Sequence, residues 1–171
     1  RAIENSALVI GARRLIAPFE RTHETKALTS SDDIVEALAS CSADAVSVLM
    51  SGDTGFFSGT RPLLAKLEGF DVQVIAGVSS LSYFSACLGI PWHDACIVSA
   101  HGRDCDVAGA VQTHEKTFAI TGGKIRAQEI CRELVARGMG DVTVHVGERL
   151  SYDDERIVGG TAAEVAQMEF G

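Results

Sequence analysis

The sequence of 171 residues predicts an α/β fold built around a mainly parallel, doubly wound sheet. Short apolar runs rich in β-branched residues alternate with runs that have helical periodicity. Several of the apolar runs lead directly into loops that contain glycine and serine. Hydrophobic residues make up 46% of the chain, which is enough for a real core. Strands and helices that alternate at this spacing are typical of a parallel sheet covered by helices.

The strand predictions depend on short apolar runs that end at turn residues. Ala-Leu-Val-Ile at 7–10 is followed by Gly11, and Ala-Val-Ser-Val-Leu-Met at 45–50 is followed by Ser51. The run 20–26 is polar, so we expect it to be a loop. The same criteria predict five further strands, at 72–75, 95–99, 117–120, 142–146 and 156–158.

The helix predictions depend on apolar spacing and on residues suited to helix ends. Residues 31–39 place apolar side chains on one helical face and acids in the first turn. Thr60 is expected to cap a helix that has Pro62 near its start, and Thr161 and Glu164 have the spacing of a capping box. Helices are also predicted at 12–17, 80–88, 107–112 and 125–137.

The composition excludes several classes of function. A net charge of −8 and a pI near 5.0 argue against nucleic-acid binding, which needs clustered cations. No apolar run reaches the roughly 18 residues of a membrane-spanning helix. Five irregularly spaced cysteines suit reduced, buried thiols in a cytoplasmic protein better than a disulfide framework.

Two glycine-containing loops are candidates for ligand binding. The first, 51–55, follows the strand at 45–50, and the second, 76–80, follows the next predicted strand. Gly52 and Gly55 have no Cβ, so the backbone there can turn sharply and approach a ligand closely. Because loops that follow parallel strands meet at one sheet edge, we expect both loops to face one ligand. The alternative is that each is a plain turn between a strand and a helix.

Three polar side chains of these loops have two interpretations each. Asp53 can accept hydrogen bonds from a ribose or an amino group, or it can bind its own backbone as turn aspartates do. Ser79 and Ser80 stand before a predicted helix, where a hydroxyl either caps the helix or binds a ligand. The residue pattern alone leaves these alternatives open.

A polar segment at 101–104 interrupts the alternation of strands and helices, and we place a domain boundary after it. The predicted domains are therefore 1–104 and 105–171. His101 and Arg103 in this segment would suit a ligand rich in carboxylates, because guanidinium binds carboxylates through two hydrogen bonds. An ordinary exposed linker is the alternative.

Other chemistries find less support in the sequence. His93, Cys96, His101 and Cys105 have spacings too irregular for a zinc site, so we predict no metal. The chain shows no Walker lysine, no Gly-x-Gly-x-x-Gly and no context for a Ser-His-Asp or Cys-His nucleophile. Glu148 follows the predicted strand at 142–146 and is either a solvated acid or a functional one.

Five segments carry a resemblance to a known family. They are Ser-Gly-Asp-Thr-Gly-Phe-Phe-Ser-Gly at 51–59, Gly-Val-Ser-Ser at 77–80, Leu-Gly-Ile-Pro-Trp at 88–92, Ser-Ala-His-Gly-Arg at 99–103 and Asp-Glu-Arg-Ile-Val-Gly-Gly-Thr at 154–161. In this order they resemble the tetrapyrrole methylase superfamily. Within it they are most similar to the precorrin (cobalt-precorrin) C5-methyltransferase branch, the methylating part of precorrin-6Y C5,15-methyltransferase. The resemblance covers most of the chain from Ala7 onward.

The resemblance implies a Rossmann-like first domain, a smaller α/β second domain and S-adenosylmethionine in the cleft between them. The implied reaction is methylation at C5 of a precorrin, with or without cobalt, in cobalamin biosynthesis. A homodimer is implied, and so is a decarboxylating C15-methylating partner that is either fused or separate. The alternatives are methylation of uroporphyrinogen or of another precorrin position, diphthine synthesis, a non-catalytic binding module and a zinc-binding interaction domain.

The family's motifs also assign roles to residues of this sequence. His101 and Arg103 match the linker motif, which we assign to the substrate. His101 and Glu148 are the candidates for a general base. Cofactor contacts are implied at Gly52, Asp53, Phe56, Ser79, Ser80 and Gly122.

The sequence departs from the family in two loop positions. Thr54 follows the loop aspartate and Ala76 precedes Gly77, where the family usually has proline. Both residues permit turns, but they make the loops less rigid. The family also leads us to expect a first strand with a glycine-rich turn before Arg1, and a final strand after Gly171.

Overall fold

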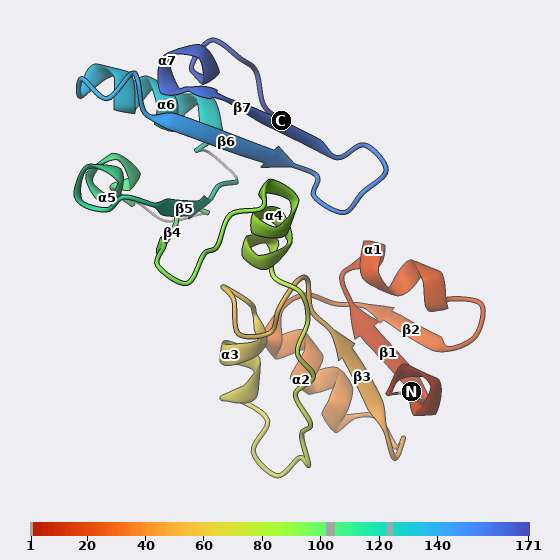
Figure 1. Cartoon of the computed structure of the whole chain (residues 1–171). Helices are drawn as coiled ribbons and strands as arrows, with labels where there is room; N and C mark the ends of the chain where they lie inside the picture. Colours follow the sequence, from red (N-terminus) through yellow and green to blue (C-terminus); the bar gives the residue numbers. More distant parts are fainter. Residues whose placement is uncertain (1, 102–104, 123–124) are drawn as a thin grey trace. The chain divides into compact units, whose positions relative to one another are not determined.

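The computed structural model describes residues 2–101, 105–122 and 125–171 (Figure 1). The chain divides into two compact units, Arg1–Ser79 and Ser80–Gly171. The domain boundary that we predict after Asp104 lies outside the described residues and stays a prediction.

The first unit contains a parallel sheet of three strands in the order β2-β1-β3 (Figure 1). Leu8 of β1 pairs with Glu24 of β2 on one side and with Val46 of β3 on the other. Because β1 is the central strand, its side chains are buried along its whole length. The strands are β1 (Leu8–Gly11), β2 (Glu24–Ala27) and β3 (Val46–Leu49).

Short helices cover this sheet. The Ser30 hydroxyl caps α2 by accepting a hydrogen bond of 3.3 Å from the Asp32 N–H. The unit contains α1 (Arg13–Ile16), α2 (Ser31–Ala39), α3 (Thr60–Leu64) and 3₁₀ turns at Ile3–Asn5 and Ala17–Phe19. In the core of this unit, two alternate residues of β1 pack against α2 and α3. The core consists of Leu8, Ile10, Ile34, Ala37 and Leu63.

Two of our element predictions in this unit are wrong. The polar run 20–26 contains most of β2, which forms because an edge strand pairs on one side only and needs few apolar residues. Residues 72–75 form no strand, and Val74 and Ile75 are 50% and 55% exposed. This apolar run has no pairing partner within the described residues. A strand is stabilised by its ladder, so hydrophobicity alone could not decide the outcome.

The predicted cap of α3 is also wrong. Gly59 occupies the N-cap position, and Thr60 is the first residue of the helix. The Thr60 side chain is buried, and its hydroxyl lies 2.9 Å from that of Ser58. The hydroxyl therefore bonds within the preceding turn rather than to the helix.

The second unit contains two pairs of strands. β4 and β5 are parallel, with Cys96 opposite Thr117, whereas β6 and β7 are antiparallel, with Glu148 opposite Arg156. The predicted strands at 95–99, 117–120, 142–146 and 156–158 are therefore confirmed, with β7 longer than expected. The strands are β4 (Cys96–Ser99), β5 (Thr117–Ile120), β6 (Thr143–Glu148) and β7 (Arg156–Thr161).

The helices of the second unit also follow the prediction. Gly89 ends α4 with a φ of +66°, a conformation that glycine adopts without strain. The Asp106 carboxylate caps α5 by accepting a hydrogen bond from the Gly109 N–H at 2.8 Å. The helices are α4 (Ser80–Leu88), α5 (Val107–Thr113), α6 (Ala127–Ala136) and α7 (Ala162–Val165). No helix of the described residues is long and apolar enough to cross a membrane.

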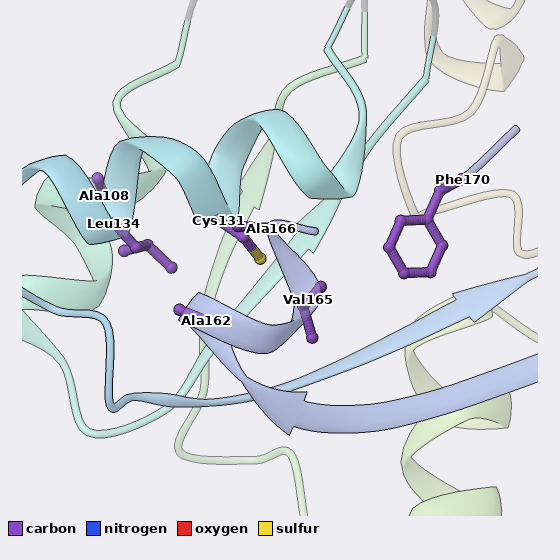
Figure 2. Packing of buried hydrophobic residues seen from close by; sticks show 7 residues of the cluster. All are labelled: Ala108, Cys131, Leu134, Ala162, Val165, Ala166 and Phe170. Carbon is purple, nitrogen blue, oxygen red and sulfur yellow. The ribbon is translucent and has the colours of Figure 1, made fainter. Parts of the chain in front are cut away.

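A cluster of buried side chains joins α5, α6 and α7. Cys131 and Leu134 of α6 face the helix that carries Ala162 and Val165 (Figure 2). Burial raises the pKa of the Cys131 thiol, so this group stays protonated. All five cysteines are free thiols, but only Cys131 is buried. The cluster consists of Ala108, Cys131, Leu134, Ala162, Val165, Ala166 and Phe170.

The predicted capping box at the start of α7 is confirmed. The Thr161 hydroxyl accepts the Glu164 N–H at 3.2 Å, and the Glu164 carboxylate accepts the Thr161 N–H at 2.8 Å. We expect Thr161→Ala to lower the free energy of unfolding by about 1 kcal/mol, whereas Thr161→Ser keeps the hydroxyl and most of the stability. Urea unfolding measures both variants, and equal stabilities would contradict a role for the cap.

The same contacts give this cap a pH dependence. The hydrogen bonds from the Thr161 backbone and side chain lower the pKa of Glu164 below its ordinary value of 4.5. A carboxylate whose pKa is lower in the folded state stabilises the protein fully above the unfolded pKa. Its contribution is lost as the pH falls through the folded pKa, so the difference between wild type and Thr161→Ala should shrink below pH 4.5.

Candidate functional site

The two glycine-containing loops of the first unit lie against each other. Gly52 has a φ of +72°, and a Cβ placed on Gly77 would lie only 2.2 Å from the Gly52 carbonyl oxygen. The backbones therefore approach more closely than any residue with a side chain would allow at position 77. The expectation that the loops 51–55 and 76–80 come together is confirmed for residues 52 and 77.

Asp53 links these two loops. One carboxylate oxygen accepts the Gly55 N–H at 2.8 Å, and the other accepts the Gly77 N–H at 3.3 Å. The first bond is the turn-aspartate interaction that the sequence left open, and the second joins loops that are 24 residues apart. We call this pair of bonds the Asp53 clasp. Each carboxylate oxygen keeps a further lone pair with which it can accept a ligand donor.

Neighbouring residues shape the ends of the first loop. The Arg14 guanidinium donates a hydrogen bond of 2.7 Å to the Ser51 hydroxyl, directly before Gly52. The Phe56 N–H donates to the Asp53 carbonyl oxygen at 3.2 Å, and the Phe56 ring meets the Phe57 ring edge-on at 5.0 Å. Arg14 was not among the residues predicted for the site. The one signal in the sequence was its place shortly after the predicted strand at 7–10.

In the second unit, the carboxyl ends of β4 and β5 bring two candidate residues together. The Ala100 N–H donates to the Ile120 carbonyl oxygen at 2.8 Å, which extends the ladder to the loop. Gly122 has a φ of +149°, and a Cβ there would lie 2.2 Å from Nδ1 of His101. The cofactor candidate Gly122 and the substrate candidate His101 are therefore in contact. Arg103 lies outside the described residues.

Gly122 also lines a pocket of about 410 Å³. The pocket lies between the loop after β5, the start of α6 and the end of β6. Arg126, Glu148 and Arg149 contribute its charged side chains, and Phe170 and Gly171 lie on its wall.

The geometry at Glu148 favours a structural role. One oxygen accepts the Gly171 N–H at 2.7 Å, and the other accepts Nη1 of Arg156 at 3.1 Å. The Glu148 side chain is only 20% exposed. Because both oxygens hold donors, His101, which is exposed, is the better placed candidate for a general base.

The remaining predicted site residues are distributed over the chain as follows. Gly52, Asp53, Phe56 and Ser79 belong to the first unit, whereas Ser80 and Gly122 belong to the second. Ser80 is the first residue of α4. Within the described part of the chain, no group of three or more histidine, cysteine, aspartate or glutamate side chains is arranged to hold a metal ion.

Comparisons with known proteins show the family to which this chain belongs. The family model described as Tetrapyrrole (Corrin/Porphyrin) Methylases matches residues 1–166. The cobalt-precorrin-7 C(5)-methyltransferase of Salmonella typhimurium strain LT2 is 33% identical over 159 residues, which cover 91% of this chain and 78% of that protein.

Two solved structures show the same fold. A precorrin-6Y methylase from Archaeoglobus fulgidus has a TM-score of 0.70 and 19% identity, with 99% of this chain and 82% of that chain covered. A uroporphyrin-III C-methyl transferase from Thermus thermophilus, complexed with S-adenosylhomocysteine, has a TM-score of 0.75 and 21% identity, with 100% and 79% covered. The predicted fold class is confirmed, and the chain belongs to the tetrapyrrole (corrin/porphyrin) methylases.

Proposed function

We propose that this chain is an S-adenosylmethionine-dependent methyltransferase that methylates C5 of a precorrin or cobalt-precorrin in cobalamin biosynthesis. The observation that carries the proposal is the 33% identity, over 91% of the chain, to a protein named cobalt-precorrin-7 C(5)-methyltransferase. The fold supports methyl transfer in general. It does not select the substrate, because a uroporphyrin-III methyltransferase has the same fold.

The residues present fit the cofactor. Gly52 and Gly77 have no side chains, so a ligand can approach the backbone of the two loops closely. The remaining lone pairs of the Asp53 carboxylate can accept hydrogen bonds from the ligand. We propose that the cofactor is held by Gly52, Asp53, Phe56, Ser79, Ser80 and Gly122. S-adenosylmethionine supplies a methyl group that its sulfonium has already activated, so no covalent enzyme intermediate is needed.

The chain's own residues then have to orient the reactants and move a proton. Holding two reactants in register can lower the barrier by roughly 7–11 kcal/mol. We assign His101 and Arg103 to the substrate, whose acetate and propionate groups suit a guanidinium. The exposed imidazole of His101, next to Gly122, is our candidate for the group that accepts a proton.

The resemblance to the family also bears on oligomeric state, domain organisation and partners. We propose a cytoplasmic homodimer with functional domains 1–104 and 105–171, joined by the segment that carries His101 and Arg103. A decarboxylating C15-methylating activity would come from a fused or separate partner. Size-exclusion chromatography with light scattering tests the dimer.

Calorimetry on the full-length protein tests the function. We expect S-adenosylhomocysteine to bind, and ATP and NAD, as control ligands, not to bind. With S-adenosylmethionine, precorrin-7 or its cobalt form should gain one methyl group at C5, whereas uroporphyrinogen III should stay unmodified. Cofactor binding without methylation of any tetrapyrrole would contradict the proposal and favour a non-catalytic binding module.

A further inference from the structure

The loop between β6 and β7, residues 149–155, contains several contacts among its own residues. The Tyr152 N–H donates to the Arg149 carbonyl oxygen at 3.0 Å, and the Ser151 N–H donates to the Glu155 carboxylate at 2.6 Å. A side-chain hydrogen bond to the same carboxylate raises the pKa of Tyr83 in α4 to about 12. The loop is therefore closed on itself and tied to a neighbouring helix.

Arg149 has an unusual backbone conformation in this loop. Its φ is +50°, and that of Ser151 is +69°. The only other described non-glycine residue with a positive φ is Phe57, which lies in the loop after Asp53. Residues held in this region often lie at functional sites, because the surrounding structure must maintain a conformation that costs free energy.

The Arg149 side chain is held on two of its sides. Its Nε lies 2.5 Å from a carboxylate oxygen of Asp154, and its guanidinium carbon lies 5.6 Å from the centre of the Tyr152 ring. No described residue accepts a hydrogen bond from its two terminal nitrogens, Nη1 and Nη2. The side chain is 64% exposed. These two nitrogens form the edge of a guanidinium that binds a carboxylate through two hydrogen bonds.

Arg149 borders the pocket of about 410 Å³ that Gly122 also lines. The other described charges of the lining have contacts within the protein: Nη1 of Arg126 donates to the Phe170 carbonyl oxygen at 3.1 Å, and Glu148 pairs with Arg156. Among the lining residues that the structure describes, Arg149 is the cation that keeps both terminal nitrogens available for a ligand in this pocket.

We propose that Arg149 binds a carboxylate of the ligand held in this pocket. The inference rests on the proposed function, which supplies two sources of this chemistry. One is the carboxylate of the methionine part of S-adenosylmethionine, and the other is an acetate or propionate group of the tetrapyrrole. Asp154 and Tyr152 act as positioning residues, because they restrain the guanidinium before a ligand arrives and so reduce the entropy lost on binding.

The variant Arg149→Met tests the proposal with two cofactor analogues. S-adenosylhomocysteine has the carboxylate, and 5′-methylthioadenosine lacks it. If the cofactor is the source, calorimetry should show about tenfold or more weaker binding of S-adenosylhomocysteine and unchanged binding of methylthioadenosine. If the substrate is the source, both analogues should bind as to the wild type, and KM for the precorrin should rise by a similar factor.

Two further variants make the result specific. Arg132→Met removes one cation from an exposed position on α6 that does not line this pocket, and it should leave every constant unchanged. Arg149→Lys keeps the charge but loses the paired geometry, and it should give an intermediate loss. Thermal unfolding of each variant establishes that it is folded.

The proposal is overturned if folded Arg149→Met, or folded Arg149→Lys where the methionine variant does not fold, retains wild-type affinity for S-adenosylhomocysteine and a wild-type KM. It is also overturned if the two analogues lose affinity equally, because the loss would then not depend on the carboxylate. Wild-type protein that fails to bind S-adenosylhomocysteine would instead contradict the proposed function, so the two failures are distinguishable.

Discussion

Replacing Gly77 with alanine is expected to lower the rate of methyl transfer by on the order of 10²-fold. A Cβ on residue 77 would lie 2.2 Å from the Gly52 carbonyl oxygen and 3.4 Å from Cα of Asp53. The atoms it meets are backbone, so a side-chain rotation cannot relieve the overlap. The two loops must separate, and the 3.3 Å bond from the Gly77 N–H to Asp53 is lost as they do.

A matched variant is available in the same loop region. Gly59 has a φ of −66°, and a Cβ there would lie 3.7 Å from the Met50 sulfur, which is ordinary contact. Gly59→Ala should therefore keep wild-type affinity for S-adenosylhomocysteine and a wild-type kcat/KM. Calorimetry and turnover compare the two variants. If Gly77→Ala behaves like Gly59→Ala, the close approach of the loops has no part in the site.

The sequence was most informative where the backbone itself makes the site. Gly52 and Gly77 could be predicted to allow close approach because only glycine lacks a Cβ, and the structure uses both positions in this way. The Asp53 clasp was predictable in part. The bond to Gly55 is local, but the bond to Gly77 depends on where the second loop folds.

Contacts between distant segments could not be predicted. Arg14 meets the Ser51 hydroxyl only because β1 and β3 are neighbours, and sheet order is not encoded in a local pattern. The strand β2 was missed because its polar composition resembles a loop. The strand prediction at 72–75 was wrong for the opposite reason. This segment has the composition of a strand but no pairing partner among the described residues. Pairing with a neighbouring strand, rather than composition alone, therefore decides whether a segment forms a strand.

The largest effect on stability is expected for Leu134→Ala. Leu134 is 2% exposed and faces Ala162 and Val165 across the core of the second unit (Figure 2). Replacing the isobutyl side chain with a methyl group should lower the free energy of unfolding by about 2–5 kcal/mol, because the alanines around it are too small to fill the cavity. Small domains are stable by only about 5–15 kcal/mol, so this loss is a large part of the total.

The measurement can be restricted to the unit that carries the mutation. Trp92 is the one tryptophan of the chain and lies in the second unit, so its fluorescence during urea unfolding follows that unit. Val135→Ala is the control, because Val135 is the next residue of α6 and is 42% exposed. It should change the stability by less than about 0.5 kcal/mol. Equal losses in the two variants would contradict the expectation that the burial of Leu134 against α7 stabilises this unit, because alanine favours the helix at both positions.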